Sequence, residues 1–202
     1  MPYNRTAAVG YARSYWRKVA SDGYIGMGGA QNYRKVNAGV FDQSAQKEVL
    51  RLNTGEAIPI DLIDDCAHFI SCSIGKPPGG GAGGISVPSA FPAGPYGQLS
   101  ADDLFAKLSE THGSAVGTKL SKPDALLKLG QLAEGDLIFY FNPAKNMYSH
   151  VAMYMSDTKK SITCHTYSRC DVRDVEPGDP FYKSNWDSVN IQNVKYTLLK
   201  LS

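Results

Sequence analysis

Cys66, His150 and His165 are the residues of this sequence best suited to covalent chemistry. A cysteine becomes a strong nucleophile when its thiol loses a proton, and a histidine close by can accept that proton and later return it. Cys66 follows two acids, Asp64 and Asp65, at the start of a short apolar run. This combination predicts catalysis by a cysteine–histidine pair, with a further polar residue to orient the histidine.

The apolar run after the two acids has the pattern of a short buried helix, with apolar side chains at helical spacing at Phe69, Ile70 and Ile74. Asp64 or Asp65 can cap this helix, because a short side-chain oxygen accepts unpaired backbone N–H groups. Cys66 would then lie in the first turn, where the helix dipole favours an anion. We therefore expect a lowered thiol pKa at Cys66. The alternative is that Cys66 is only a small buried apolar residue.

The two histidines belong to neighbouring predicted strands. His150 opens the strand 150–155, and His165 lies near the end of the strand 161–166, with a turn at 157–160 between them. In an antiparallel hairpin around that turn, the two side chains lie opposite one another, about 5 Å apart. We therefore expect a contact in which His165 orients His150 through one ring nitrogen.

The remaining elements place helices first and strands later. We expect helices over 4–20 and 42–53, a loop over 23–40, helices beginning at Ser100 and near Pro123, and strands over 137–141 and 194–199. Helices followed by antiparallel strands indicate an α+β fold. The length of 202 residues suits a single domain that spans residues 1–202.

The composition is that of an ordinary globular protein, with 43% hydrophobic and 20% charged residues. A net charge of +2 does not indicate a nucleic-acid partner, and no run of about 20 apolar residues could span a membrane. The N-terminal residues lack the apolar core of a signal peptide. We therefore expect a cytoplasmic protein, or one exported without a cleaved signal.

Three segments, taken in order, resemble the NlpC-type branch of the papain-like cysteine peptidases and amidases. They are the pair Asp65-Cys66 opening a helix, Gly135-Asp136-Leu137 introducing a strand, and His150-Val151 opening another strand. The opening residues 3–12 and the pair His165-Thr166 are similar to an amidase domain family within that group. Three features depart from the pattern of the group, namely His68, the order Ser71-Cys72-Ser73 and the length of the glycine- and proline-rich tract 75–97.

The resemblance implies a papain-like fold in which N-terminal helices pack on a C-terminal antiparallel sheet. It implies a cysteine-dependent amide hydrolase with Cys66 as the nucleophile, His150 as general base and acid, and His165 as the orienting residue. The backbone N–H of Cys66, beside Asp65 at the helix start, would contribute to an oxyanion hole. No cofactor and no metal are expected.

The group most often cleaves peptidoglycan, so the implied substrate is a peptidoglycan stem peptide or another peptide amide. A small hydrolase of this kind could serve as an antibacterial toxin delivered to the periplasm of a target cell by a secretion system. Its further partner would then be an immunity or inhibitor protein.

The glycine- and proline-rich residues 75–97 are expected to form a long surface loop. One hypothesis is that this loop is a wall of the substrate groove and governs which amide is accepted, because glycine lets the backbone approach an extended peptide closely. The other is that it only connects two helices.

Two further functions compete with hydrolysis. Cys66, His68, Cys164 and His165 are soft metal ligands, but Cys-x-His and adjacent Cys-His are not usual zinc spacings. A catalytically inactive module that binds cell-wall peptides or a partner is the second, although a binder has no need of the cysteine and both histidines. Cys164 and Cys170 either form a local disulfide or occupy ordinary strand and loop positions.

Overall fold

The computed structural model describes residues 2–28, 33–42, 48–76, 79–156, 161–166, 169–173 and 192–202. The α-helices in these ranges are α1 (Arg5–Tyr15), α2 (Cys66–Ile74), α3 (Ala101–Thr111) and α4 (Lys122–Lys128). The strands are β1 (Tyr24–Gly26), β2 (Tyr33–Lys35), β3 (Gly39–Asp42), β4 (Val49–Leu52), β5 (Ala57–Pro59), β6 (Gly113–Leu120), β7 (Leu137–Asn142), β8 (Met147–Ser156), β9 (Ser161–Cys164), β10 (Arg169–Arg173) and β11 (Lys195–Leu201). The fold is therefore a mixture of helices and antiparallel sheets, as the sequence predicts.

A six-stranded antiparallel sheet forms the centre of the molecule, with the strand order β10-β9-β8-β7-β11-β6. The side chains of β7 alternate between two apolar clusters. Leu137, Phe139 and Phe141 belong to one cluster, and Ile138 and Tyr140 belong to the other. The sheet is thus buried on both faces, which explains why β7 reads as a continuous apolar run.

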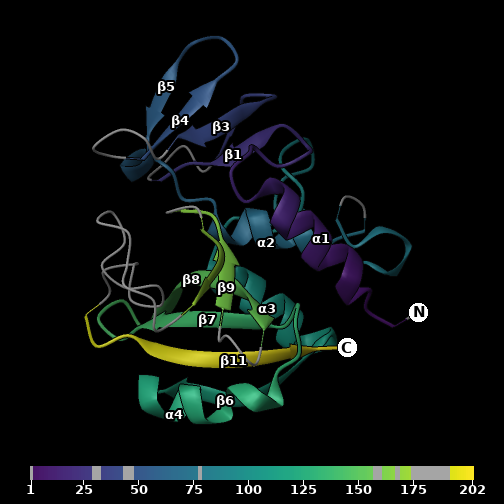
Figure 1. Cartoon of the computed structure of the whole chain (residues 1–202), viewed down its shortest axis with the longest axis vertical. Helices are drawn as coiled ribbons and strands as arrows, with labels where there is room; N and C mark the ends of the chain where they lie inside the picture. The colour runs from purple at the N-terminus through teal and green to yellow at the C-terminus, as the bar shows by residue number, and fades with distance from the viewer. Residues whose placement is uncertain are drawn as a thin grey trace.

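Helices cover both faces of this sheet (Figure 1). Residues of α1, α2 and α3 share one cluster with the sheet, and residues of α4 share the other. Burying the apolar stripes of these helices supplies roughly 1.5–3 kcal/mol for each large side chain removed from water. The predicted helix caps contribute locally: Asn4 accepts from the N–H of Ala7 at 3.1 Å, and Ser100 accepts from the N–H of Asp103 at 3.3 Å.

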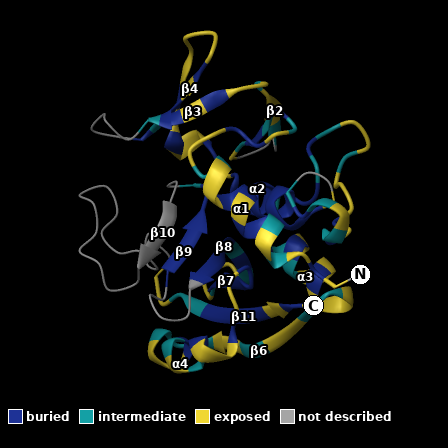
Figure 2. Ribbon diagram, turned by 45° about the vertical axis from the view of Figure 1, so that its right-hand side comes forward, coloured by how far each residue is buried: buried dark blue, intermediate teal, exposed yellow. Residues whose placement is uncertain are grey.

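Helix α2 lies between the large sheet and the smaller sheets of the N-terminal half, where it is enclosed on all sides (Figure 2). All nine of its residues are buried. A helix that is buried all round is apolar all round rather than amphipathic. The few polar side chains in α2, among them His68 and Cys72, must therefore find partners inside the protein.

The N-terminal half contains strands where the sequence predicted a loop over 23–40 and a helix over 42–53, so both predictions were wrong. β1 pairs with β2, and β3, β4 and β5 form a three-stranded sheet. In β4 the alternation of Leu50 and Leu52 inside with Arg51 outside has the period of a strand. These strands are only three or four residues long, so their period is easily taken for that of a helix.

The described part of the glycine- and proline-rich segment, residues 75–76 and 79–97, packs against the protein more closely than a free surface loop does. Ile85 and Val87 are buried in the core cluster of α2, and the hydroxyl of Tyr96 contacts the backbone N–H of Lys76 at 3.2 Å. A side chain at Gly80 would collide with the backbone of Ile74 and Gly84. The glycines of this segment therefore permit close packing of backbone against backbone.

The later elements match the prediction closely, with α4 containing Pro123 in its first turn. α1 ends at Tyr15 rather than near residue 20, and β6 and β10 were not predicted. The predicted turn at 157–160 lies outside the described residues. Among the helices that the structure describes, none is long and apolar enough to cross a membrane.

Candidate functional site

Cys66 is the first residue of α2 and is 1% exposed. The carbonyl of Asp65 accepts the first turn's hydrogen bond from the N–H of Phe69 at 2.9 Å, so Asp65 occupies the cap position. Its carboxylate, however, makes no hydrogen bond to the N–H groups of the helix, contrary to the predicted cap. The side chain is turned instead toward two histidines and a strand.

The Asp65 carboxylate is wholly buried and joins three parts of the chain. One oxygen lies 2.8 Å from Nδ1 of His68 and accepts from the N–H of Gly26 at 2.5 Å. The other lies 2.6 Å from Nδ1 of His165. Because it fixes the residue before Cys66 to β1 and to the end of β9, this carboxylate sets the position of the thiol.

The electrostatics of this cluster stabilise an ionised Asp65. Burial alone would raise the carboxyl pKa, but the positive charge of His68 and the hydrogen bonds from His165 and His68 outweigh it and lower the pKa to about 2. For His68 the effects are reversed in sign: burial disfavours the charged imidazolium and so acts to lower its pKa. Cys72, Asp65 and Asp22 outweigh that effect and raise the His68 pKa well above its usual value.

His165 does not make the predicted hydrogen bond with His150. Its Nε2 lies 2.9 Å from the carbonyl oxygen of Tyr15, its Nδ1 faces Asp65, and its ring stacks on Phe69 with centroids 3.9 Å apart. Both ring nitrogens are therefore engaged elsewhere. His150 is also buried, with its ring edge-to-face against Tyr140 at 4.9 Å between centroids.

The physical reason is a register difference of one residue. Thr163 pairs with Met153, so residue 165 extrapolates to the level of Val151 rather than His150. A shift of one residue moves a side chain to the other face of a sheet. His165 accordingly lies on the side of α2, whereas His150 contacts Tyr140 of the cluster on the side of α4.

The thiol of Cys66 lies beside the backbone of the strand that carries His150. Burial and the nearby Asp64 carboxylate raise the thiol pKa well above its usual value, while a hydrogen bond from the N–H of Val151 acts to lower it. The Asp64 oxygen lies 3.9 Å from the sulfur. The expectation of a lowered Cys66 pKa was therefore wrong, because desolvation and a neighbouring carboxylate outweigh the helix terminus.

A pocket of about 280 Å³ opens between the segment before Cys66 and the segment before His150. Its wall includes two residues of opposite charge, Asp64 and Lys145. The remaining lining residues are Met27, Leu99, Ser100, Ala101, Met147, Tyr148 and Ser149. None of the described residues between 75 and 97 lines this pocket. The role of this segment as a wall of the substrate groove therefore stays a prediction.

The set of soft ligands considered from the sequence, Cys66, His68, Cys164 and His165, does not come together as a metal site. Within the described ranges, the group that could hold an ion is Asp22, His68 and Cys72. The spacing of His68 and Cys72, four residues apart on one helix, was a signal for this group. Asp22 had no such signal, since only folding brings it to α2. The side chain of Cys170 is outside the described part of the structure.

These features define an α+β protein with a buried cysteine at a helix start beside a histidine-bearing strand and a charged pocket. The chain belongs to the family described as "Putative amidase domain", whose model matches residues 2–194. Nothing matches in the comparison with curated proteins, and nothing matches among solved structures.

Proposed function

We propose that this protein is a cysteine-dependent amide hydrolase of the papain-like, NlpC-type group, within one domain that spans the chain. Membership of an amidase family supports hydrolysis of an amide. The observation that carries the proposal is the position of the Cys66 thiol at the start of α2. There it lies beside the backbone of Val151, the residue directly after His150.

In the proposed reaction, Cys66 is the nucleophile and His150 the general base. The ring of His150, which packs on Tyr140 in the resting structure, turns toward α2 and takes the thiol proton as Sγ bonds to the substrate carbonyl carbon, because a raised thiol pKa disfavours a resting thiolate. The backbone N–H of Cys66 stabilises the oxyanion. His150 then returns the proton to the departing amine, and water hydrolyses the thioester to release the acid and the free thiol.

His165 acts in this proposal as a positioning residue through Asp65. The stack on Phe69 and the hydrogen bond to the Tyr15 carbonyl hold its ring, and the ring holds the carboxylate that precedes the nucleophile. The role differs from direct orientation of His150, but it still makes His165 part of the site. Its loss should disturb the position of the thiol rather than remove a proton carrier.

The charges in the pocket favour a peptide that carries both an ammonium and a carboxylate group. Asp64 and Lys145 line the same small pocket and can each pair with the opposite charge. A peptidoglycan stem peptide has this chemistry, so it is the proposed substrate. A toxin role, with an immunity or inhibitor protein that blocks the pocket, follows as the proposed biological setting.

The test is digestion of purified peptidoglycan and of simple peptide amides, with mass spectrometry of the products. Cys66→Ala should lower turnover by at least about 10³-fold with the fold intact. Cys164→Ala is the matched control, since Cys164 is also buried but receives no role in the proposed reaction. Unchanged turnover in Cys66→Ala, or no cleavage of any amide by the parent protein, would contradict the proposal and favour a binding module.

A second comparison distinguishes the roles of His150 and His165. His150→Ala should abolish the chemical step, whereas His165→Ala should retain more activity, because a positioning residue transfers no proton. The pH dependence of kcat should keep its shape in His165→Ala, while its magnitude falls. If His165→Ala were the more damaging substitution, the general base would have to be reassigned.

A further inference from the structure

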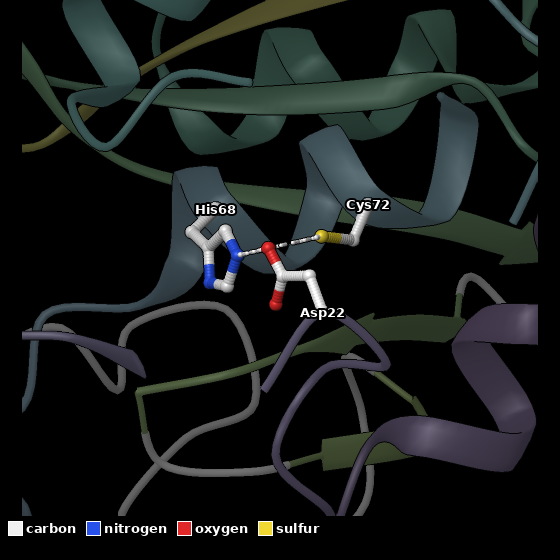
Figure 3. A group of neighbouring side chains, drawn as sticks. All are labelled: Asp22, His68 and Cys72. Atoms are coloured by element: carbon white, nitrogen blue, oxygen red, sulfur yellow. Dashed lines mark hydrogen bonds and ion pairs between the residues drawn. The ribbon is translucent and has the colours of Figure 1, made fainter. Parts of the chain in front are cut away.

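Asp22, His68 and Cys72 form a compact group of metal-ligating side chains away from the proposed nucleophile (Figure 3). His68 and Cys72 come from consecutive turns of α2, and Asp22 reaches them from the loop between α1 and β1. Cys72 lies six residues after Cys66, which corresponds to an axial rise of about 9 Å. The group is therefore distinct from the thiol at the helix start.

We propose that Asp22, His68 and Cys72 bind a Zn²⁺ ion through Oδ2, Nε2 and Sγ, and that the ion joins the loop of Asp22 to α2. Carboxylate, imidazole and thiolate are the three ligand types that zinc takes in proteins, and three protein ligands leave a fourth position for water. Neither the proposal nor its test depends on the proposed hydrolytic activity.

The distances between the three ligand atoms match a zinc ion at their centre. Nε2 of His68 lies 3.0 Å from Oδ2 of Asp22, Sγ of Cys72 lies 3.4 Å from the same Nε2, and Sγ lies 3.9 Å from Oδ2. A point equidistant from three atoms with these separations lies about 2.0 Å from each. Zinc bonds to nitrogen and oxygen measure about 2.0–2.2 Å and zinc–sulfur bonds about 2.3 Å.

The surroundings of the ligands are those of a metal site. His68 holds its other ring nitrogen, Nδ1, 2.8 Å from the buried Asp65 carboxylate, which fixes the ring with Nε2 toward the group. A carboxylate behind a ligating histidine is the usual outer partner of zinc-bound imidazole. Asp22 is oriented in turn by the backbone N–H groups of Tyr24 and Tyr96, at 3.1 and 2.9 Å.

The burial of the three side chains leaves a path by which a metal ion can enter, and their chemistry favours zinc. The side chains of His68 and Cys72 are fully buried, whereas that of Asp22 is 19% exposed, so an ion can enter past Asp22. On binding, Zn²⁺ replaces the proton on Nε2 of His68 and the thiol proton of Cys72, and both protons pass to solvent. A thiolate ligand favours zinc over magnesium or calcium.

The test uses the full chain, stripped of metal with a chelator and titrated with Co²⁺ as a spectroscopic probe and then with Zn²⁺. We expect one Co²⁺ per chain, with a thiolate-to-cobalt charge-transfer band that one equivalent of Zn²⁺ abolishes. Cys72→Ser should lose the band, while the matched variants Cys66→Ser and Cys164→Ser retain it. Absence of the band in the parent protein, or its persistence in Cys72→Ser, would overturn the proposal.

A second variant is needed because the buried substitution Cys72→Ser could prevent the protein from folding. Asp22→Asn changes a partly exposed side chain and should weaken zinc binding at least about tenfold. Zinc should raise the thermal unfolding temperature of the parent protein more than that of Asp22→Asn, because a ligand that binds only the folded state stabilises it. Equal zinc-induced shifts in the two proteins would count against coordination by Asp22.

Discussion

Replacing Asp65 by asparagine tests whether its buried carboxylate organises the start of α2. Asparagine keeps the size of the side chain and one acceptor oxygen but removes the charge that faces His68 and His165. The carboxyl pKa falls from 3.8 to about 2 on folding, which corresponds to roughly 2 kcal/mol of stabilisation at neutral pH. Leaving a buried histidine without its charge partner costs about 3–5 kcal/mol in other proteins.

We therefore expect Asp65→Asn to lower the free energy of unfolding by about 2–4 kcal/mol. For a chain of this length the melting temperature should fall by roughly 5–15 °C. Thermal and urea unfolding, followed by circular dichroism in buffer that contains a chelator, measure the change without a contribution from metal. Asp64→Asn is the matched control, because Asp64 is exposed and its raised pKa means that its charge does not favour folding. It should change stability by less than about 0.5 kcal/mol.

The stability difference between the parent protein and Asp65→Asn should also depend on pH, in a direction set by the lowered pKa of Asp65. A carboxyl whose pKa is lowered by folding contributes stability above its unfolded pKa and loses it as pH falls through its folded pKa. The difference between the parent protein and Asp65→Asn should thus be full at about pH 5–6 and narrow between pH 4 and pH 2. It should also narrow as pH rises through the pKa of His68, which Asp65 helps to raise. If Asp65→Asn were as stable as Asp64→Asn, or if the difference did not narrow in acid, the carboxylate would not hold the site as argued.

Three further outcomes follow from the structure. Iodoacetamide should label Cys66 with a midpoint above pH 9, because burial and Asp64 raise the thiol pKa, and labelling well below pH 8 would contradict this. Phe69→Ala should cost about 3–5 kcal/mol in urea unfolding and disturb the stacked ring of His165, whereas a loss below 1 kcal/mol would mean that α2 repacks. Ser100→Ala should cost about 1 kcal/mol through the lost cap of α3, with Ser109→Ala, which changes a serine in the last turn of the same helix, as the control that changes less.

Local patterns in the sequence were sufficient to predict a helix, strand or cap wherever its structure depends on residues close to it in the chain. The run from Leu137 to Phe141 is apolar throughout because its sheet is buried on both faces, and Ser100 and Asn4 cap their helices through contacts within one turn. The short strands β3 and β4 were mistaken for a loop and a helix, because three or four residues carry too little periodicity.

The same distinction applies to the site. The sequence by itself determined that Cys66 opens a helix and that His150 lies on a buried strand, since both depend on neighbours in the chain. Only the tertiary structure decided the partners of His165, because a one-residue difference in register moves its ring to the opposite face of the sheet. Tertiary structure also raised the thiol pKa through burial, and it brought Asp22 to His68 and Cys72 across 46 residues of chain. Desolvation and contacts between distant residues arise only on folding, so no local pattern records them.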